Sequence, residues 1–550
     1  MDLSPVARMA AVIDYHERSK HRLDRYAASP GYLDWANQPD PFRRYAGVSR
    51  TLLPLAEPVK AVPTLDEALA GQVAPAPLAL AGIGQLLYDA LAISAWKRAG
   101  SSRWAVRCNP SSGNLHPTEA YLLLPPLAGL GDEAGLYHYE VQDHALARRA
   151  SLDAGRWGRL VHGLPEGGFL IALASIHWRE AWKYGERAYR YCQHDLGHAI
   201  AQLACAASAL GWEASVLAGA GDDCIATLAG LFDQRGAEAE WPGVLLALSP
   251  RPLPAGAGRR WLPALAALPE TWAATLAGVP NRLSGEHASW PVLDEVAMAC
   301  RRERAPAQWT AASASVLPPE LPLRPLPARQ IFRTRRSAVE MDGERVLSGE
   351  AFIRLVAALL PQARAPWPAL PWPVAVHPVF FVHRVRGFAP GVYLLLREPA
   401  ARSGLQAALG RFPHWAVLDE VALGLPLFRL AEGDLGRYAQ IANCHQALAA
   451  DGAFAVAMVA AFEPVLAAEG PAAYRRLFWE AGALGQVLYL EAEAAGMRGT
   501  GIGCYFDDVI HELLGITDRR FQSLYGFSVG AAVEDGRVGT EPAYPARSMA

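Results

Sequence analysis

The sequence has little cysteine, little lysine and no long apolar run. Seven cysteines in 550 residues form neither a CxxC pair nor an evenly spaced framework, which excludes a disulfide scaffold and favours reduced thiols. The longest apolar stretches, such as residues 453–462, are too short to cross a bilayer. We therefore expect a soluble, unprocessed, cytoplasmic protein without a membrane partner.

Charge of one sign is not in excess either. The chain carries 51 Lys and Arg against 54 Asp and Glu, a net charge of −3, which gives no basis for nucleic-acid binding. Small-molecule or peptide partners fit this balance better. A chain of this length exceeds one typical core, and 52% hydrophobic residues supply ample apolar surface, so we expect a globular protein of two or more domains.

Small polar residues are concentrated in one loop, residues 107–119. Ser111, Ser112 and Asn114 offer side-chain hydrogen-bond donors. Gly113 permits close approach of the backbone to a flat or anionic ligand, and prolines fix both ends of the loop. An apolar strand is expected directly after it. The pattern predicts a ligand-binding loop, although these residue types are equally compatible with an ordinary polar turn.

A second concentration of chemistry lies at residues 177–190. Lysine occurs at only four positions of the chain, and one of them, Lys183, precedes Tyr184 here. A desolvated lysine can lose its proton and an arginine practically cannot, so the pair is a candidate for proton transfer; the alternative is a surface lysine on a helix. His194 and His198 lie four apart on the next expected helix, but no third ligand is evident, and we expect no metal site.

The sequence contains an internal repeat. Residues 188–190, Ala-Tyr-Arg, recur at 473–475, which is 285 positions later. Each copy opens an alanine-rich stretch with apolar residues nearly all round, 188–210 or 473–495, which predicts a buried helix. Further matched positions at the same spacing are Gly197 and Gly482, Gly211 and Gly496, and Asp222 and Asp507. Two copies in one chain predict a fused pseudo-dimer.

The stretch between the copies is rich in proline and alanine. We therefore predict a first domain at 1–250, a connector at 251–328 and a second domain at 329–550. Some helix is expected in the middle of the connector, at 272–299.

The second half carries a different set of polar motifs. Near its start Arg333, Arg335 and Arg336 precede Ser337, a combination that suits a phosphate, with a solvated basic helix as the alternative. After the second buried helix comes a glycine-rich segment that we interpret as a turn: Thr500, Gly501, Ile502 and Gly503. Arg537 follows the last expected strand.

These motifs together resemble the nitroreductase-like FMN oxidoreductases, in particular the azoline-oxidase (SagB-type dehydrogenase) branch. The residues that carry the resemblance are the 110–119 loop, Lys183-Tyr184 and Arg335-Arg336-Ser337. It implies an α+β fold of two tandem nitroreductase-like domains, with Lys183 and Tyr184 catalytic. It also implies FMN held by Arg107, Pro110, Ser111, Ser112, Gly113, Asn114, Arg333, Arg335, Arg336, Ser337, Thr500, Gly501, Ile502, Gly503 and Arg537.

The motifs are divided unequally between the halves, so only one composite flavin site can be assembled. The first half holds the serine-rich loop and Lys183-Tyr184; the second half holds the arginine cluster and the glycine-rich segment. The loop that matches the first half's is Pro371-Trp372-Pro373, without serines. Residues 18–22 are also basic and could supply a second phosphate clamp, which would allow a second flavin site. A symmetric dimer would have two sites.

Three functions follow from the resemblance. The first is an FMN-dependent dehydrogenase or oxidase that converts an azoline in a peptide or small molecule to an azole. The second is an NAD(P)H-dependent nitro- or quinone-type reductase. The third is a non-catalytic flavin-binding partner within a biosynthetic complex. Biosynthetic partner enzymes are expected in the first and third cases, and a pseudo-dimer within one chain is compatible with a monomer.

Overall fold

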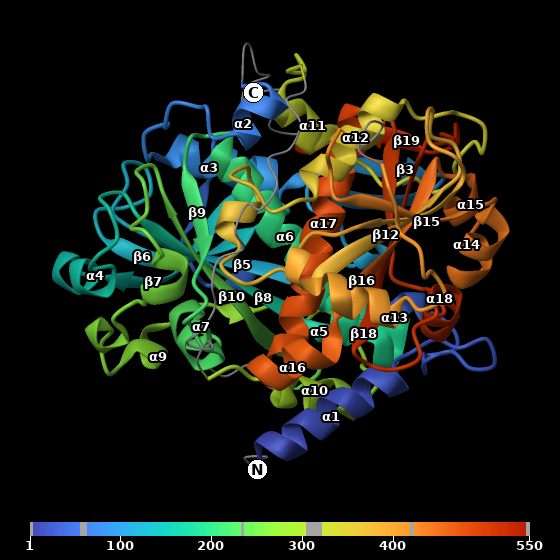
Figure 1. Ribbon diagram of the computed structural model, residues 1–550. Helices are drawn as coiled ribbons and strands as arrows, with labels where there is room; N and C mark the ends of the chain where they lie inside the picture. The colour runs from blue at the N-terminus through green and yellow to red at the C-terminus, as the bar shows by residue number, and fades with distance from the viewer. Residues whose placement is uncertain (1–3, 56–62, 233–235, 304–321, 419–422, 546–550) are drawn as a thin grey trace.

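The computed structural model describes residues 4–55, 63–232, 236–303, 322–418 and 423–545. Two antiparallel seven-stranded sheets lie on either side of two long central helices (Figure 1). The elements of the first half are α1 (Pro5–Arg18), η1 (Trp35–Asn37), β1 (Tyr45–Ala46), β2 (Arg50–Leu52), α2 (Leu65–Leu69), α3 (Leu80–Ala90), β3 (Ile93–Ala99), β4 (Ser102–Arg107), η2 (Ser112–Asn114), β5 (Thr118–Leu124), β6 (Ala134–Glu140), β7 (Ala145–Leu152), α4 (Ala154–Leu160), β8 (Phe169–Ile176), α5 (His177–Tyr184), η3 (Gly185–Arg187), α6 (Ala188–Ser208), β9 (Glu213–Val216), α7 (Asp222–Ala229) and β10 (Glu240–Ser249).

The second half repeats this order of elements. Its members are α11 (Ala328–Thr334), α12 (Gly349–Ala358), η5 (Trp367–Ala369), β12 (Val376–Val382), β13 (Gly391–Leu395), η6 (Pro399–Ala401), α13 (Arg402–Ala408), β14 (Ala416–Val417), β15 (Leu427–Glu432), α14 (Gly436–Ala442), α15 (Leu448–Asp451), β16 (Phe454–Ala461), α16 (Phe462–Glu469), α17 (Ala473–Ala494), β17 (Arg498–Ile502), α18 (Asp507–Leu514), β18 (Phe521–Gly530) and β19 (Gly539–Glu541). The sheet orders are β2-β7-β6-β5-β8-β10-β9 and β14-β15-β13-β12-β16-β18-β17. The strands of the two sheets follow one topology except at one edge, where β2 and β14 come from different places in the chain, and the predicted tandem duplication is confirmed.

The two buried helices predicted from the repeat are α6 and α17, and they cross at matched glycines. A Cβ added to Gly197 would lie 2.3 Å from the carbonyl oxygen of Trp479. A Cβ added to Gly482 would lie 2.3 Å from the carbonyl oxygen of His194. Each contact is the other one moved by the repeat spacing, so a pseudo-twofold axis passes through the crossing, as in an isologous dimer interface.

Two buried carboxylates, each paired with arginine, repeat the same symmetry. Asp507 accepts hydrogen bonds from Arg190 at 2.6 Å and from Arg187 at 2.8 Å. Its mirror, Asp222, accepts from Arg475 at 2.7 Å. Each carboxylate begins a helix of one half; Arg190 and Arg475 belong to the long helix of the other half, and Arg187 directly precedes α6. The halves are thus joined by buried charges as well as by apolar packing.

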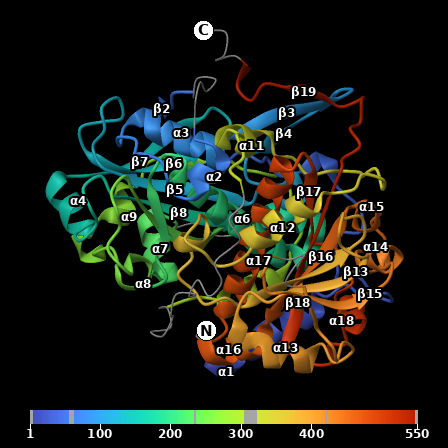
Figure 2. The same cartoon turned by 45° about the horizontal axis from the view of Figure 1, so that its top comes forward.

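Each half also sends a segment into the other. His16 on α1 contacts the second half, with its Nε2 3.2 Å from Gln522 Oε1. In return β19 pairs with β3 of the first half, and Tyr544 donates a hydrogen bond to the carbonyl oxygen of Val141 at 2.9 Å (Figure 2). The strand expected at 525–530 is therefore not the last one, because a further strand completes the hairpin of the first half.

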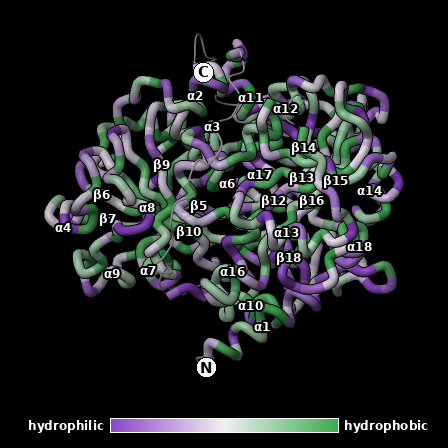
Figure 3. The backbone as a smooth tube through the Cα atoms, in the orientation of Figure 1, coloured by the Kyte–Doolittle hydropathy of each residue, from purple (hydrophilic) through white to green (hydrophobic). Residues whose placement is uncertain are grey.

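The predicted connector folds against the first half over its described part. It contains α8 (Ala257–Arg260), η4 (Leu265–Ala267), α9 (Trp272–Thr275), β11 (Val279–Pro280) and α10 (Pro291–Ala299). β11 pairs with β1, and Trp272 is buried in the core of the first half. Residues 304–321 of the connector lie outside the described residues. Hydrophobic residues follow the strands of both sheets (Figure 3).

Candidate active site

A cavity of about 950 Å³ lies between the two halves. The predicted residues that line it are Arg107, Pro110, Ser111, Ser112, Gly113, Asn114, Tyr184, Arg335, Arg336, Ser337, Thr500, Gly501, Ile502, Gly503 and Arg537. Lys183 and Arg333 do not line it. The unequal motifs of the two halves thus meet at one place, as the resemblance implies.

The serine-rich loop is held by a carboxylate of α6. Ser111 Oγ donates to Asp195 at 2.7 Å, and Ser112 donates to it through both its backbone N–H and its Oγ at 3.0 Å. Asn114 Nδ2 donates to the carbonyl oxygen of Ala105 at 2.8 Å. These side chains were expected to offer their donors to a ligand. The structure corrects that expectation, because their donors hold the loop in place.

Gly113 brings the loop against Tyr184. Its backbone has φ +58°, and an added Cβ would lie 2.5 Å from the Tyr184 hydroxyl oxygen, so this position requires glycine. Burial raises the pKa of Tyr184 well above 10.0. The hydroxyl is therefore a neutral proton donor at the cavity wall across the physiological pH range.

Two carboxyl groups are buried behind this wall. Burial raises the pKa of Asp195 to about 7, and the Ser111 and Ser112 hydrogen bonds oppose that shift. Burial also raises the pKa of Glu180, and the charge of the neighbouring Asp195 raises it further. Glu180 lies one turn before Tyr184 on α5. The site thus contains two carboxyl groups whose protonated form burial favours, and Asp195 can hold a proton near neutral pH.

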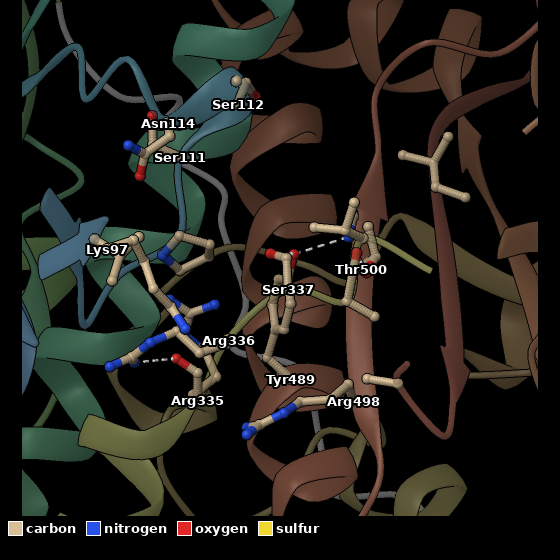
Figure 4. Close-up of a pocket in the computed structure, with 18 of the residues that line it drawn as sticks. Lys97, Ser111, Ser112, Asn114, Arg335, Arg336, Ser337, Tyr489, Arg498 and Thr500 are labelled. Atoms are coloured by element: carbon tan, nitrogen blue, oxygen red, sulfur yellow. Dashed lines mark hydrogen bonds between the residues drawn. The ribbon is translucent and has the colours of Figure 1, made fainter. Parts of the chain in front are cut away.

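Cations gather at another part of the cavity wall. Figure 4 shows Lys97 and Arg336 extending toward the same region, with Arg498 and Ser337 beside them. Burial lowers the pKa of Lys97, and Arg336 and Arg498 lower it further. The pKa of Arg336 falls to about 10, first through burial and then through Arg335. These cations repel one another, so an anion would be stabilised among them.

Arg335 and Arg333 have other contacts. Arg335 is 3% exposed and donates to the carbonyl oxygens of Cys108 at 3.0 Å and Arg107 at 2.9 Å. It ties the arginine cluster of one half to the loop of the other. Arg333 lies over the Tyr88 ring, 3.8 Å from its centroid. The predicted clamp of three arginines is therefore divided: Arg336 faces the cavity, Arg335 bridges the halves and Arg333 packs outside.

The glycine-rich segment is the edge strand β17 and not the expected turn. The Gly501 N–H of this strand donates a hydrogen bond to the Tyr489 hydroxyl at 2.8 Å, and that hydroxyl is also 2.8 Å from Ser337 Oγ. Gly503 accepts hydrogen bonds from Arg187 at 3.1 and 3.0 Å. The strand is thus fixed beside the arginine cluster.

Several lining residues were not predicted from the sequence: Lys97, Asp195, His198, Tyr489, Arg498 and Tyr525. Lys97 had one available signal, because it is one of four lysines in an arginine-rich chain. Lys183 lies with its Nζ 5.2 Å from the Tyr184 ring centroid. Arg537 lines the rim with an 89% exposed side chain paired to Asp535.

The histidines considered for a metal have other partners. His194 Nε2 lies 3.1 Å from the Leu524 carbonyl oxygen, and His198 Nε2 lies 3.0 Å from the Tyr525 hydroxyl. The described part of the chain holds no group of three or more metal-ligating side chains. Among the described helices none is both long and apolar enough to cross a membrane.

The pseudo-twofold axis generates a second cavity, of about 690 Å³. Its charged lining residues are Glu213 and Arg259 alone among those described. The basic residues near the N-terminus do not reach it, since Lys20 and Arg22 pair with Asp508 on α18 of the second half. The suggested second phosphate clamp is therefore not formed there.

Comparison with known proteins agrees with this architecture. The Nitroreductase family model matches residues 75–236 and 393–531, more than half of the chain. A crystal structure of a nitroreductase-type protein from Anabaena variabilis has a TM-score of 0.68 at 20% identity, and the match covers 95% of this chain and 99% of that one. That likeness shows the fold.

Two further matches come from peptide-modifying systems. The trifolitoxin-processing protein TfxB of Rhizobium leguminosarum bv. trifolii is 37% identical over 117 residues, which cover 19% of this chain and 30% of TfxB. The chain thus matches less than a third of that relative's length. A chain of the Escherichia coli microcin synthetase McbBCD complex with truncated pro-MccB17 is 21% identical with a TM-score of 0.26, covering 45% of this chain and 94% of that one.

Fold and cavity together define an oxidoreductase of the FMN type, with its site built between two like domains. The chain belongs to the Nitroreductase family. The family predicted from the serine-rich loop, the Lys-Tyr pair and the Arg-Arg-Ser motif is confirmed, and the match to TfxB agrees with the azoline-oxidase branch.

Proposed function

We propose that the protein is an FMN-dependent dehydrogenase that oxidises an azoline within a peptide to the azole. The observation that carries the proposal is the arrangement of one cavity, with mutually repelling cations at one part of its wall and Tyr184 with buried carboxyls at another. The first part suits a phosphate and the second suits proton transfer.

The cation cluster fits the FMN phosphate. Lys97, Arg336 and Arg498 supply charge, and the Ser337 hydroxyl supplies a further hydrogen bond. Burial and neighbouring cations lower the pKa values of Lys97 and Arg336, and Arg498 beside them pairs with Glu493. When bound, FMN supplies a hydride acceptor, which the side chains of the chain lack.

The proton of the reaction is assigned to the first half. We propose that Tyr184 contacts the reacting part of the substrate and that Lys183, beside its ring, adjusts its proton affinity. Asp195 lines the same cavity with its pKa raised to about 7, and burial raises the pKa of Glu180 one turn before Tyr184. Gly113 fixes the Tyr184 hydroxyl against the loop, which orients it toward the cavity.

A peptide substrate is supported by two observations. The cavity volume of about 950 Å³ is near the upper end of small-molecule sites, roughly 300–1,000 Å³, which leaves room beside a cofactor. The partial match to a trifolitoxin-processing protein associates this sequence type with peptide modification. We infer that partner enzymes form the azoline, and that a single cytoplasmic chain completes the site.

The test begins with the absorption spectrum of the purified protein. We expect one FMN per chain after denaturation and quantification, and bleaching of the flavin absorbance when a thiazoline-containing peptide is added without oxygen. Two flavins per chain, or none after reconstitution with FMN, would contradict the single composite site. Bleaching by NAD(P)H and not by the peptide would establish the reductase function instead. A flavin that neither reagent bleaches would indicate a non-catalytic partner.

A further inference from the structure

Two half-buried cysteines, Cys444 and Cys504, lie together at the edge of the large cavity. Cys504 lines the cavity directly after β17. The Phe506 N–H donates to the Ala442 carbonyl oxygen at 2.8 Å, and Gln446 Nε2 donates to the Cys504 carbonyl oxygen at 2.8 Å. These two hydrogen bonds lie on either side of the cysteines and hold their segments against each other.

The loop that carries Cys444 has an unusual backbone. Cys444 has φ +52° and His445 has φ +61°, a left-handed conformation that non-glycine residues rarely adopt. This sharp turn lies between the end of α14 and the start of α15, in the segment that the Gln446 and Phe506 hydrogen bonds hold against residues 504–506. The surrounding hydrogen bonds fix the turn, so the position of the thiol does not depend on a flexible loop.

The two sulfurs have different environments. Cys444 is the main cause of a lowered Cys504 pKa, which burial opposes, with a smaller contribution from His21. His21 Nδ1 accepts a hydrogen bond from the Ala27 N–H at 3.0 Å, which leaves its Nε2–H as the donor to Cys504. Arg187 acts in the same direction. Cys504 is thus the thiolate and Cys444 the protonated partner.

The other five cysteines do not share this environment. Four of them, Cys108, Cys192, Cys205 and Cys300, are fully buried, and burial raises the pKa of each. Cys224 is partly buried, and its pKa is raised to about 11. Only Cys504 therefore combines thiolate character with access to a cavity and a second thiol in contact.

We propose that Cys504 and Cys444 are a peroxide-reactive dithiol that closes to an intrachain disulfide. The Cys504 thiolate attacks one oxygen of hydrogen peroxide, the O–O bond breaks, and hydroxide leaves, giving a sulfenic acid. The Cys444 sulfur then attacks the Cys504 sulfur, the S–O bond breaks, and the second oxygen leaves as water with the Cys444 proton. Two thiols and one peroxide become one disulfide and two waters.

The test counts thiols and mass, and needs neither bound flavin nor turnover. Reduced protein is treated with one equivalent of hydrogen peroxide per chain, and we expect the loss of two thiols, a mass decrease of about 2 Da, and a Cys444–Cys504 peptide in a non-reducing digest. Cys444→Ser should stop at a sulfenic acid on Cys504 that dimedone traps. Cys504→Ser should not react, and the control Cys224→Ser should behave as the wild type.

Three results would overturn the proposal. They are full retention of thiols by the wild-type protein after one equivalent of peroxide, a disulfide that maps to other cysteines, and dimedone labelling of the wild type equal to that of Cys444→Ser. Because the first two are measured on the unchanged protein, a variant that fails to fold leaves the test decisive. The flavin count and the bleaching experiment judge the proposed function separately.

Discussion

The two cavities occupy equivalent places in the two halves, yet only the large one is lined by the serine-rich loop, the cation cluster and Tyr184. The carboxylates behind their loops show how they diverged. Asp195 holds the serine loop by accepting hydrogen bonds from Ser111 and Ser112. Its mirror, Glu480, binds the backbone N–H of Ala375 at 3.1 Å and pairs with Arg397 at 2.5 Å.

The same position on the long helix therefore has two uses. In the second half the carboxylate is neutralised by Arg397, as a structural group should be when it is buried. In the first half Asp195 titrates near neutral pH behind the cavity wall. The large cavity also has six cations in its lining, whereas the small one has Arg259 alone. The two halves therefore diverged in the charged residues of their cavities while keeping the same fold.

The largest expected effect tests whether chemistry belongs to the large cavity. Tyr184→Phe should reduce azoline oxidation by about 10²–10⁴-fold and leave flavin bound, because it removes the proton donor but keeps the ring against Gly113. Steady-state turnover and flavin content are measured on the same sample. Lys183→Ala should lose less, since Lys183 lies outside the cavity lining. Near wild-type turnover by Tyr184→Phe would contradict the proposed role of Tyr184 in azoline oxidation.

The second effect concerns the mirror ion pairs that join the halves. Asp507→Asn leaves two buried arginines, Arg187 and Arg190, without their carboxylate and should cost about 3–5 kcal/mol in the free energy of unfolding. Asp222→Asn leaves a single arginine, Arg475, without its carboxylate and should therefore lower the free energy of unfolding by less. Denaturant titration at pH 7 compares the two variants. Equal losses in their free energy of unfolding would show that the second arginine beside Asp507 adds nothing.

The sign of the pH dependence follows from the Asp507 carboxyl. The adjacent arginines hold its pKa far below 3.8 in the folded protein, against the effect of burial. Its contribution to stability is therefore present above about pH 4 and is lost as the pH falls toward the folded pKa. The stability difference between the wild type and Asp507→Asn should narrow below pH 4. A difference that stays constant with pH would exclude this carboxylate as its source.

The third effect compares the one cation of the small cavity with its counterparts in the large one. Arg336→Ala should weaken FMN binding by about 10–150-fold, equivalent to about 1.5–3 kcal/mol for a charged hydrogen bond, and excess FMN should restore activity. Arg259→Ala is the matched control and should leave FMN affinity unchanged. Fluorescence titration with FMN measures both, and equal losses would place a phosphate in the small cavity.

The smallest effect is expected at the rim. Arg537→Ala should change FMN affinity by less than about threefold, because a fully solvated guanidinium paired to Asp535 gains little from a further partner. The same FMN titration applies. A loss as large as that of Arg336→Ala would show that the rim closes over the phosphate.

The fold could be predicted well from the sequence because the duplication leaves an internal repeat, which can be recognised without secondary-structure propensities. A constant spacing of 285 positions marks both long helices, and the matched glycines mark their crossing. The exchanged segments could not be predicted in the same way. α1 and β19 are fixed by contacts with the opposite half, and no local pattern records a partner hundreds of residues away.

The candidate site was predicted in outline and less well in detail. Residue types located the serine loop and the arginine cluster, but not where each polar group points. Ser111 donates to Asp195 and Arg335 donates to backbone carbonyls, which only the packing of the halves determines. Lys97 was missed because it lies in the β3–β4 hairpin, with no motif around it.

The pairing of β19 with β3 also sets an order of events during synthesis. Lys97 Nζ donates to Thr540 Oγ1 at 2.8 Å, so a cation of the site is positioned by a residue translated 443 positions later. Translation proceeds at about 5–20 residues per second, which separates the synthesis of the two residues by roughly 20–90 seconds. A chain that ends before residue 540 contains every strand of both seven-stranded sheets and still lacks this contact. The cation cluster is thus finished late, after the scaffold that surrounds it.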